Sequence, residues 1–482
     1  MINLIKNELY KLFHKPSVYI LMLLIVIFNF IGIFGYKLLV TDDSTSATIN
    51  QMNISTYETL LSTLDPSNSA DVGTYVEYKV TYELLKFEND HSFKSTSSEY
   101  YYIENNIKSD LTKLYTAQYI NKDDEGVKEA QAQYDKDVDF LLNNYDWKVL
   151  VNNEITKDNS MIKLLDESTD STQIETIKMD IVSLQYRLDN NVPFSQTDAS
   201  TDLSGYSSAY STYSSYSTDE KTFATRDQLI QKRTAEKNYK LLKYRIDNKL
   251  ITNDESYGNS YSSLNMFKGA FTSISFIIVL CVIIISSSIL TEEFNKGTIK
   301  QLFIRPYTRS KILTSKVLAI FITVLLFILV NALSGVIISA IVNGSIKTLA
   351  DPILVYSFIS HEVIKMNVLS YSLLTFLTLL PEYLMLTFIT LLVGALTTNG
   401  ASSIVGGIGL YIVSSIFEAY ATIKWVSFVP TMNWNLSGFL FGGISEYQYV
   451  TLGKSIVIDV ITIAALVIGT YIVFDKKEIK NQ

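Results

Sequence analysis

Cysteine and histidine are scarce in this sequence. Its 482 residues include one cysteine, Cys281, and three histidines that lie far apart, His14, His91 and His361. One cysteine cannot form an intrachain disulfide, and scattered histidines without partner cysteines do not match the usual ligand sets of zinc or haem. We therefore expect no metal site on this chain.

Motifs for nucleotide binding and hydrolysis are also missing. The nearest approach to a P-loop is Gly453-Lys454-Ser455, but Gln448 occupies the position of the first required glycine. The sequence contains no Gly-x-Ser-x-Gly or His-Glu-x-x-His pattern. We therefore expect no catalytic residue and no cofactor on this chain, so that any chemistry would be supplied by another protein.

Charged residues are nearly absent from six long apolar runs. Each run has the length of about 20 residues that a membrane-crossing helix needs. The runs are residues 17–40, 267–291, 317–343, 369–397, 401–423 and 453–474. They predict an all-α membrane protein with six transmembrane helices.

Lysine and arginine are unevenly distributed around these runs. They concentrate in residues 1–16, 295–316 and 475–482, which six spans place on one side of the membrane. Because positively charged flanks stay in the cytoplasm, we predict that both termini are cytoplasmic. The long polar segment after the first span, with a formal charge of about −15, is then extracellular. The predicted domains are 1–40, with the first transmembrane helix; 41–265, the extracellular domain; and 266–482, with transmembrane helices two to six.

The extracellular domain is predicted to be mainly helical. Hydrophobic residues recur at helical spacing in residues 174–188 and again from about 220 to 250. Residues 184–190 and 242–248 share the pattern Leu-x-Tyr-Arg-(Leu/Ile)-Asp-Asn. The match has two interpretations: two helices that end in the same way, or a pair of equivalent helix ends that face a pore mouth.

A serine- and tyrosine-rich segment, residues 198–219, separates these two helices. Its low aliphatic content predicts a flexible loop or hairpin. The segment could be an adaptable contact surface, as in tyrosine-rich antibody loops, or only a tether. Its regularly spaced tyrosines are Tyr206, Tyr210, Tyr213 and Tyr216.

A short amphipathic helix is predicted on the cytoplasmic side between spans two and three. Gly297 is placed to end the preceding helix, Thr298 and Gln301 form a capping box, and Pro306 stops the new helix. Its apolar face consists of Ile299, Leu302 and Phe303, rimmed by Lys300, Arg305 and Arg309. Such a helix could dock into a groove on a cytoplasmic partner, or it could lie against lipid headgroups.

The pattern from Glu293 to Lys316 resembles the hallmark of type-two ABC exporter permeases. It reads Glu-Phe-x-x-Gly-Thr-Ile-Lys-x-Leu-x-x-x-Pro-x-x-Arg-x-x-Ile-Leu-x-x-Lys. In that family this segment is the coupling helix, at about residues 298–305 here, which contacts a separate ATPase subunit. The resemblance implies coupling roles for Glu293, Gly297, Thr298, Ile299, Leu302, Phe303, Arg305, Pro306 and Arg309.

The amino terminus supports the same resemblance. Ile2, Ile5, Leu9, Leu12 and Phe13 fall on one face of a helix that Pro16 separates from the first span. This amphipathic helix is similar to the elbow helix of the family, and the spacing of Glu8 and Lys11 matches it. Without the pattern from Glu293 to Lys316, a cationic anchor flank that happens to be helical would be the preferred interpretation.

The resemblance implies a permease that exports an amphipathic or hydrophobic cargo, such as an antimicrobial peptide or drug, across a bacterial cell membrane. ATP and Mg would be bound by the ATPase partner. A second permease protomer, identical or homologous, and membrane lipid are the other expected partners, and nucleic acid is not one. Compact members of the family have only a short loop after span one, so the large domain here departs from their pattern. Mechanotransmission-type permeases also have an outer domain after span one, but they have four spans, so the six spans predicted here argue against that type. The alternative is a non-transporting sensor or assembly factor whose extracellular domain binds a ligand.

Three acidic residues fall within the predicted spans. Glu382 follows Pro381 in span four, where it either bonds to the helix bundle at a proline kink or lies on the substrate path. Glu418 and Asp459 lie close enough to the predicted outer surface for their carboxylates to be solvated.

Overall fold

The computed structural model describes most of the chain and divides it into two units. The described residues are 1–40, 43–94, 97–167, 170–195, 198–216, 226–251, 275–298, 307–343, 350, 352–420, 424–434, 436–440 and 450–477. The first unit, here called the membrane unit, comprises Met1–Lys37, Tyr216–Leu241 and Ser260–Gln482. The second, here called the helical unit, comprises Leu38–Ser215 and Leu242–Asn259. This division differs from the predicted domain 41–265, because the described residues 226–241 group with the membrane unit.

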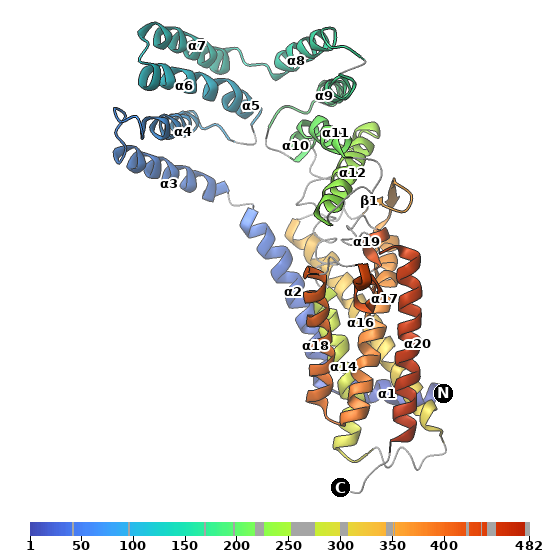
Figure 1. Cartoon of the computed structure of the whole chain (residues 1–482). Helices are drawn as coiled ribbons and strands as arrows, with labels where there is room; N and C mark the ends of the chain where they lie inside the picture. The colour runs from blue at the N-terminus through green and yellow to red at the C-terminus, as the bar shows by residue number, and fades with distance from the viewer. Residues whose placement is uncertain are drawn as a thin grey trace. The chain divides into compact units, whose positions relative to one another are not determined.

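Long apolar helices form the membrane unit (Figure 1). In chain order the helices are α1 (Ile2–Phe13), α2 (Pro16–Val40), α14 (Ser275–Asn295), α16 (Arg309–Asn343), α17 (Val368–Thr397), α18 (Gly400–Tyr420) and α20 (Leu452–Lys476). Within the described residues, five helices are long and apolar enough to cross a membrane, and a shorter apolar stretch covers Gly400–Ser414 of α18. The predicted all-α membrane class is confirmed, whereas the count of six spans stays a prediction.

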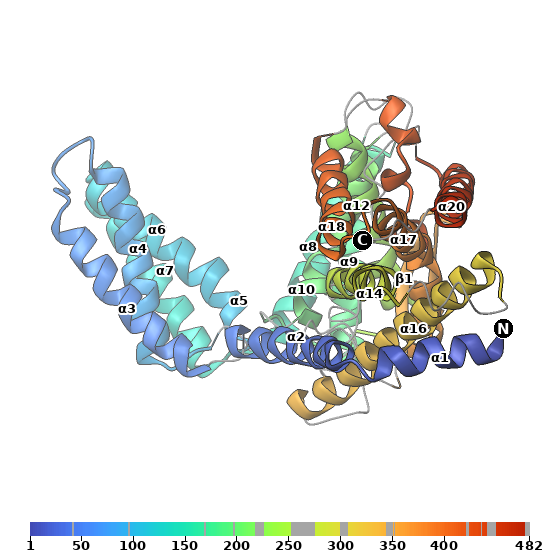
Figure 2. The same ribbon diagram turned by 90° about the horizontal axis from the view of Figure 1, so that it is seen from below.

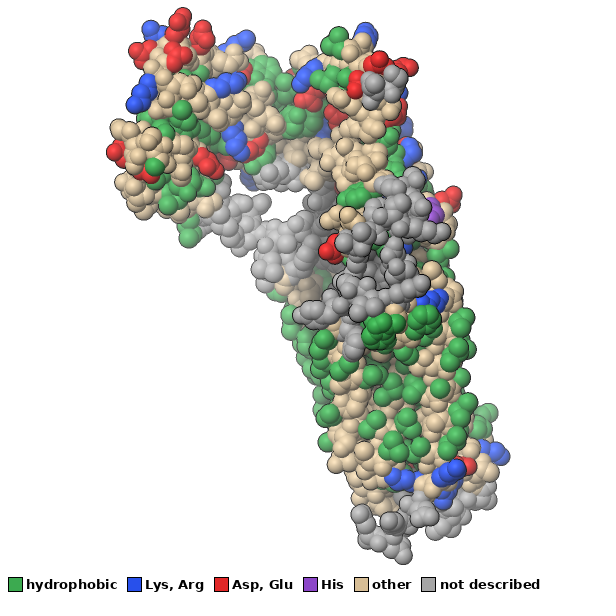
Figure 3. All heavy atoms as spheres, in the orientation of Figure 1, with side chains coloured by type: hydrophobic (Ala, Val, Ile, Leu, Met, Phe, Trp, Pro, Cys, Tyr) green, Lys and Arg blue, Asp and Glu red, His purple; other side chains and the backbone are tan. Residues whose placement is uncertain are grey.

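Helix α17 packs against three other long helices of this unit, α14, α18 and α20 (Figure 2). Close approach depends on small residues. A side chain at Gly407 of α18 would place its Cβ 2.7 Å from Thr390 Oγ1 of α17, so only glycine fits there. Polar contacts also join helices: Asn29 of α2 donates to Asn331 Oδ1 and Ser334 Oγ of α16 at 2.9 and 2.7 Å. The visible outer face of the bundle carries many hydrophobic side chains, as a lipid-facing surface would (Figure 3).

The connections between these helices also contain regular structure, including a hairpin that the sequence did not predict. Strands β1 (Ile353–Ser357) and β2 (Glu362–Met366) form an antiparallel hairpin in register from Ile353 opposite Met366 to Ser357 opposite Glu362. β1 is largely buried, because Ile353 and Val355 pack against Tyr371 of α17. Between α18 and α20 lie the short helices η5 (Lys424–Phe428), η6 (Pro430–Met432) and α19 (Ser437–Leu440).

The helical unit is built from shorter helices. They are α3 (Asp43–Ser62), α4 (Val72–Asp90), α5 (Tyr100–Tyr102), η1 (Ile103–Ile107), α6 (Lys108–Tyr115), η2 (Thr116–Asn121), α7 (Asp124–Asn143), α8 (Trp147–Ile162), α9 (Ser171–Asn190), α10 (Asp198–Ser204) and α11 (Tyr206–Ser215). Helices α4, α6 and α7 share one apolar core, and α8 and α9 share a smaller one around Val151, Leu184 and Phe194. The helix predicted at 220–250 is observed as α12 (Arg226–Asp247), whose last residues belong to this unit.

The predicted flexible loop at 198–219 is wrong for its described part, which forms helices α10 and α11. The reason is a buried cation. The guanidinium of Arg187, on α9, is fully buried and donates to Ser200 O, Ser200 Oγ and Ser204 Oγ at 2.7 to 3.0 Å. Tyr206 is buried at the start of α11, and the segment is therefore part of a folded core.

The short repeat marks two helices that end in the same way. After α9, Asn191 is left-handed (φ 54°) and Val192 N donates to Arg187 O. After α12, Lys249 is left-handed (φ 54°) and Leu250 N donates to Arg245 O. Both ends have the hydrogen bond of a Schellman motif. This supports the first of the two interpretations of the repeat.

Candidate functional site

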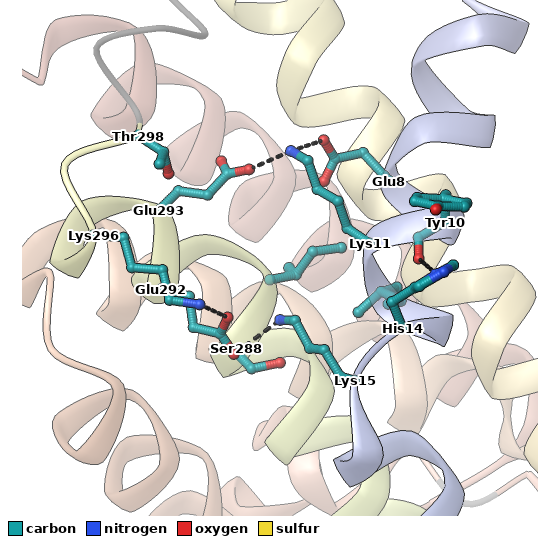
Figure 4. A pocket seen from close by; sticks show the side chains of 12 residues that line it. Glu8, Tyr10, Lys11, His14, Lys15, Ser288, Glu292, Glu293, Lys296 and Thr298 are labelled. Carbon is teal, nitrogen blue, oxygen red and sulfur yellow. Dashed lines mark hydrogen bonds and ion pairs between the residues drawn. The ribbon is translucent and has the colours of Figure 1, made fainter.

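Four charged side chains meet where α1, the end of α14 and the start of α16 come together. Lys11 Nζ lies 3.0 Å from Glu8 Oε1 and 2.8 Å from Glu293 Oε1 (Figure 4). Lys316 Nζ lies 2.8 Å from Glu8 Oε2 and 2.7 Å from Glu293 Oε2. Each lysine therefore contacts both carboxylates. We call this set, Glu8, Lys11, Glu293 and Lys316, the α1 ion-pair network.

The network is mostly buried and electrically balanced. Lys316 is 0% exposed, and besides its ion pairs it donates hydrogen bonds to Glu8 Oε2 and to Ile289 O, the latter at 3.3 Å. Glu8 and Glu293 are buried as well, whereas Lys11 is partly exposed. Two carboxylates and two ammonium groups sum to zero charge, which is the condition for burying ions at tolerable cost.

The electrostatics of the two α1 residues reflect this arrangement. Burial alone would raise the pKa of the Glu8 carboxyl, but Lys316 and Lys11 outweigh burial and hold that pKa below its ordinary value. Burial would lower the pKa of Lys11, but Glu293 and Glu8 raise it above its ordinary value. Both groups are therefore held in their charged forms.

A second, more exposed set of ion pairs borders the network. Lys15 Nζ lies 2.8 Å from Glu292 Oε1, and Lys296 Nζ lies 3.4 Å from Glu292 Oε2. These residues line a cavity of about 480 Å³ between α1 and α14, which also borders Glu293 and Thr298 (Figure 4). The cavity combines charged side chains with apolar ones, among them Leu12 and Ile289.

The structure places several of the predicted coupling residues around this network. Glu293 is a member, and Gly297 has φ 68° just after α14 ends, as its proposed role as a left-handed terminator requires. Thr298 lines the cavity, and Arg309 begins α16 and donates to Asp475 O and Lys477 O near the end of α20. The remaining predicted residues lie outside the described part of the chain: Ile299, Leu302, Phe303, Arg305 and Pro306.

Sequence reasoning missed Lys316 as a member of the site, although it is the last residue of the recognised pattern. The signal was a lysine in a buried apolar stretch, between Leu313 and Ala319. A buried lysine needs acidic partners. Glu8, spaced three residues from Lys11, was identified, but nothing in the sequence indicated which carboxylates would meet Lys316.

The acidic residues of the spans have different environments. Glu382 is buried in α17 directly after Pro381, as both interpretations of this residue allow. Asp459 of α20 is 2% exposed, so the expectation that it is solvated is wrong. It lies on the face of α20 that packs inward, opposite the exposed Val457 and Ile461. The side chain of Glu418 lies outside the described part of the structure.

No cluster of three or more His, Cys, Asp or Glu side chains that could hold a metal ion occurs among the described residues. Cys281, the single cysteine, is buried in α14.

Comparisons with known proteins identify the family. A family model described as ABC-2 family transporter protein matches residues 2–479. The chain is also similar to a Bacillus subtilis (strain 168) protein, "Uncharacterized protein YhcI", with 25% identity over 229 residues, which cover 47% of this chain and 69% of YhcI. No solved structure matches the chain. The chain therefore belongs to the ABC-2 family of transporter proteins, multi-pass membrane permeases that are not themselves catalytic and that work with a separate ATP-binding subunit.

Proposed function

We propose that this chain is the permease subunit of an ABC exporter in which two permease protomers, identical or homologous, work with two ATPase subunits that bind ATP and Mg. Both termini and the segment 296–308 face the cytoplasm, and residues 41–265 are extracellular. The cargo is amphipathic or hydrophobic, such as an antimicrobial peptide or drug. The proposal combines family membership with the distribution of lysine and arginine along the chain.

The α1 ion-pair network is the observation that carries this proposal. The coupling segment, about residues 298–305, begins just after Glu293 and ends before Lys316. These two residues contact each other and both contact α1. A force that the ATPase applies to the segment would therefore act on α1, α14 and α16 together. Because buried ion pairs are intolerant of separation, the three helix ends would move as one body.

Arg309 extends the same connection to a fourth helix. It lies at the start of α16 and donates to two carbonyl oxygens near the carboxyl end of α20, at Asp475 and Lys477. Cations at a helix carboxyl end interact favourably with its unpaired carbonyls. Displacement of the start of α16 would therefore also reach α20, which packs along α17.

The test is whether this chain transports with an ATPase. The tagged permease is purified from native membranes, and a co-purifying ATPase is identified by mass spectrometry. The two proteins are then reconstituted in liposomes, and ATP hydrolysis is measured with a panel of cationic antimicrobial peptides and amphipathic drugs. The proposal predicts cargo-stimulated hydrolysis and ATP-dependent cargo movement. A bound ligand with no associated ATPase and no cargo movement would instead support the sensor or assembly factor.

A further inference from the structure

Asp459 is a buried carboxylate that the proposed coupling mechanism does not use. It lies in α20 and is 2% exposed, on the inward side of a helix whose other side is apolar. Neither of its carboxylate oxygens has a hydrogen-bond partner among the residues that the structure describes, and no ion pair found there includes it. Charged groups at such positions in membrane proteins usually face a partner or a transport pathway.

Ser455 and Asn433, two polar residues near Asp459, use their hydrogen atoms elsewhere. Ser455, one turn before Asp459, donates its hydroxyl hydrogen to Asn433 Oδ1 at 2.9 Å. Asn433 donates its amide hydrogens to Ser427 O and Val429 O at 3.1 and 2.8 Å. Because a serine has one hydroxyl hydrogen and an asparagine has two amide hydrogens, neither residue has a hydrogen left for the Asp459 carboxylate.

Helix α17, which packs against α20, also has a polar residue near Asp459 that cannot donate a hydrogen bond to it. Thr470 Oγ1 lies 3.4 Å from Phe388 O, and Lys477 Nζ lies 2.8 Å from Leu396 O, so α17 and α20 run side by side in the same direction. Both α-helices rise by the same distance per residue, so these two residue pairs align Asp459 of α20 with about Thr378 of α17. Thr378 donates its hydroxyl hydrogen to Thr375 O at 2.8 Å and is therefore unable to donate to Asp459.

Among the residues that the structure describes, no hydrogen-bond donor reaches the Asp459 carboxylate. An ionised carboxylate buried in this way needs a cation or a hydrogen-bond donor from outside the chain. A hard divalent cation would need about six oxygen ligands, and no group of three or more acidic, histidine or cysteine side chains that could hold one lies among the described residues. A primary ammonium needs only three acceptors, and it combines the positive charge with the donors that the site lacks.

We propose that Asp459 binds the protonated primary amine of the cargo at the contact between α17, α20 and the segment 427–433. The inference rests on the proposed exporter function and narrows its cargo to amphipathic amines, including lysine-containing peptides. In this structure the carboxylate is enclosed, so the amine enters as α17 and α20 separate. Asp459 is the ion-pair partner, and Asn433 with Ser455 fixes the backbone around it.

A photolabelling experiment tests this site in the full-length permease in lipid nanodiscs. The probe is a long-chain alkyl diazirine with a terminal primary amine, and the matched probe has a hydroxyl at the same position. The fraction of α17 and α20 peptides labelled is measured against probe concentration. We expect the amine probe to bind the wild type about tenfold more tightly than the alcohol, which corresponds to one charge-assisted contact.

The variants separate an ion-pair role from a structural one. Asp459→Asn should bind amine and alcohol alike, Asp459→Glu should keep the preference for the amine, and the exposed Asp475→Asn on the same helix should behave as the wild type. Because Asp459→Asn removes an unpaired buried charge, its thermal midpoint should equal or exceed that of the wild type. Equal binding of both probes by the wild type, an amine preference kept by Asp459→Asn, or a lower midpoint of that variant would each overturn the proposal. The measurement needs no ATP, so it can succeed even if the exporter function fails.

Discussion

Lys316 shows how much one buried side chain can determine at this end of the membrane unit. It has no exposed surface, and its ammonium group lies within 2.8 Å of carboxylate oxygens from two different helices. Sequence alone identified the outer members of the network, Glu8, Lys11 and Glu293, because they belong to recognisable patterns. It could not identify Lys316 as their common partner, since that depends on how α1 packs against α16.

Replacing Lys316 by Met should therefore be strongly destabilising. After this change the two buried carboxylates of Glu8 and Glu293 have Lys11 as their one remaining cation in the network. Loss of one partner of a buried ion pair lowers the free energy of unfolding by about 3 to 5 kcal/mol. We expect a clear fall in the thermal unfolding midpoint of the detergent-purified protein. Lys296→Met, at the exposed pair with Glu292, should cost less than about 1 kcal/mol.

A double variant checks the cause. Glu8→Gln combined with Lys316→Met restores charge balance, because Lys11 then pairs with Glu293 alone. This double variant should recover part of the lost stability. If it were as unstable as the sum of the single changes, lost packing rather than unpaired charge would be responsible.

Glu88, on α4 of the helical unit, gives a pH prediction. Burial, reinforced by Glu104 and partly offset by Lys108, raises the pKa of Glu88 to about 7 from its ordinary value of 4.5. Between these values the folded protein keeps a proton that the unfolded chain releases, so this group makes the fold less stable as pH rises from 4.5 to 7.

Glu88→Gln should therefore stabilise the protein more at pH 8 than at pH 5, by about 2 to 3 kcal/mol at most. The measurement is the difference in thermal midpoint between variant and wild type at the two pH values. Asp90→Asn, an exposed neighbour on the same helix, is the matched control and should show no such difference. Equal effects of Glu88→Gln at both pH values would contradict the prediction.

At the scale of elements, periodicity and capping signals were sufficient where local chemistry decides the structure. The amphipathic α1, the apolar helices and the terminator at Gly297 all follow from short sequence patterns. The hairpin at 353–366 and helices α10 and α11 do not. The hairpin depends on burial of β1 against Tyr371, and α10 depends on Arg187 of α9. Composition gave the wrong prediction for the described residues 198–216 because it does not show that the buried Arg187 donates to Ser200 and Ser204.

Arg187 should be required for α10 to form. Its guanidinium is fully buried and also stacks over Phe194 at 4.3 Å, so Arg187→Met removes several charge-assisted hydrogen bonds at once. We expect a loss of about 3 kcal/mol or more and new proteolytic cleavage between residues 196 and 205. The exposed Lys178→Met on the same helix should leave the cleavage pattern unchanged. Absence of new cleavage in Arg187→Met would mean that α10 is held by other contacts.

At the scale of the whole molecule, the sequence predicted a multi-pass membrane protein and its family, and both are confirmed. Orientation and the number of spans depend on the membrane itself, so they remain predictions from the distribution of Lys and Arg. The extracellular domain predicted at 41–265 stays a prediction, although the described residues 226–241 group with the membrane unit. For example, the buried Glu236 accepts a hydrogen bond from Tyr356 OH at 2.5 Å. The spacing of residues in the sequence did not predict this contact.

Orientation is testable by cysteine labelling in intact cells. Cys281 is buried and is replaced by Ser, and single cysteines are introduced at Ser204, Ser345 and Ser310. A membrane-impermeant maleimide should label positions 204 and 345 but not position 310. External labelling at position 310 would reverse the predicted topology and place the coupling segment outside the cell.

The central claim is that residues 298–305 couple the permease to an ATPase. A photocrosslinking amino acid at Phe303, in cells that contain the partner ATPase, tests it most directly. Leu302→Asp with Phe303→Asp should also release the ATPase, because each uncompensated charge in an apolar contact costs several kcal/mol. Gly297→Pro serves as a control that disturbs placement of the segment, and the membrane level of each variant shows that it still folds. The account predicts crosslinks from position 303 to the ATPase; crosslinks to lipid alone, with the ATPase demonstrably bound, would contradict it.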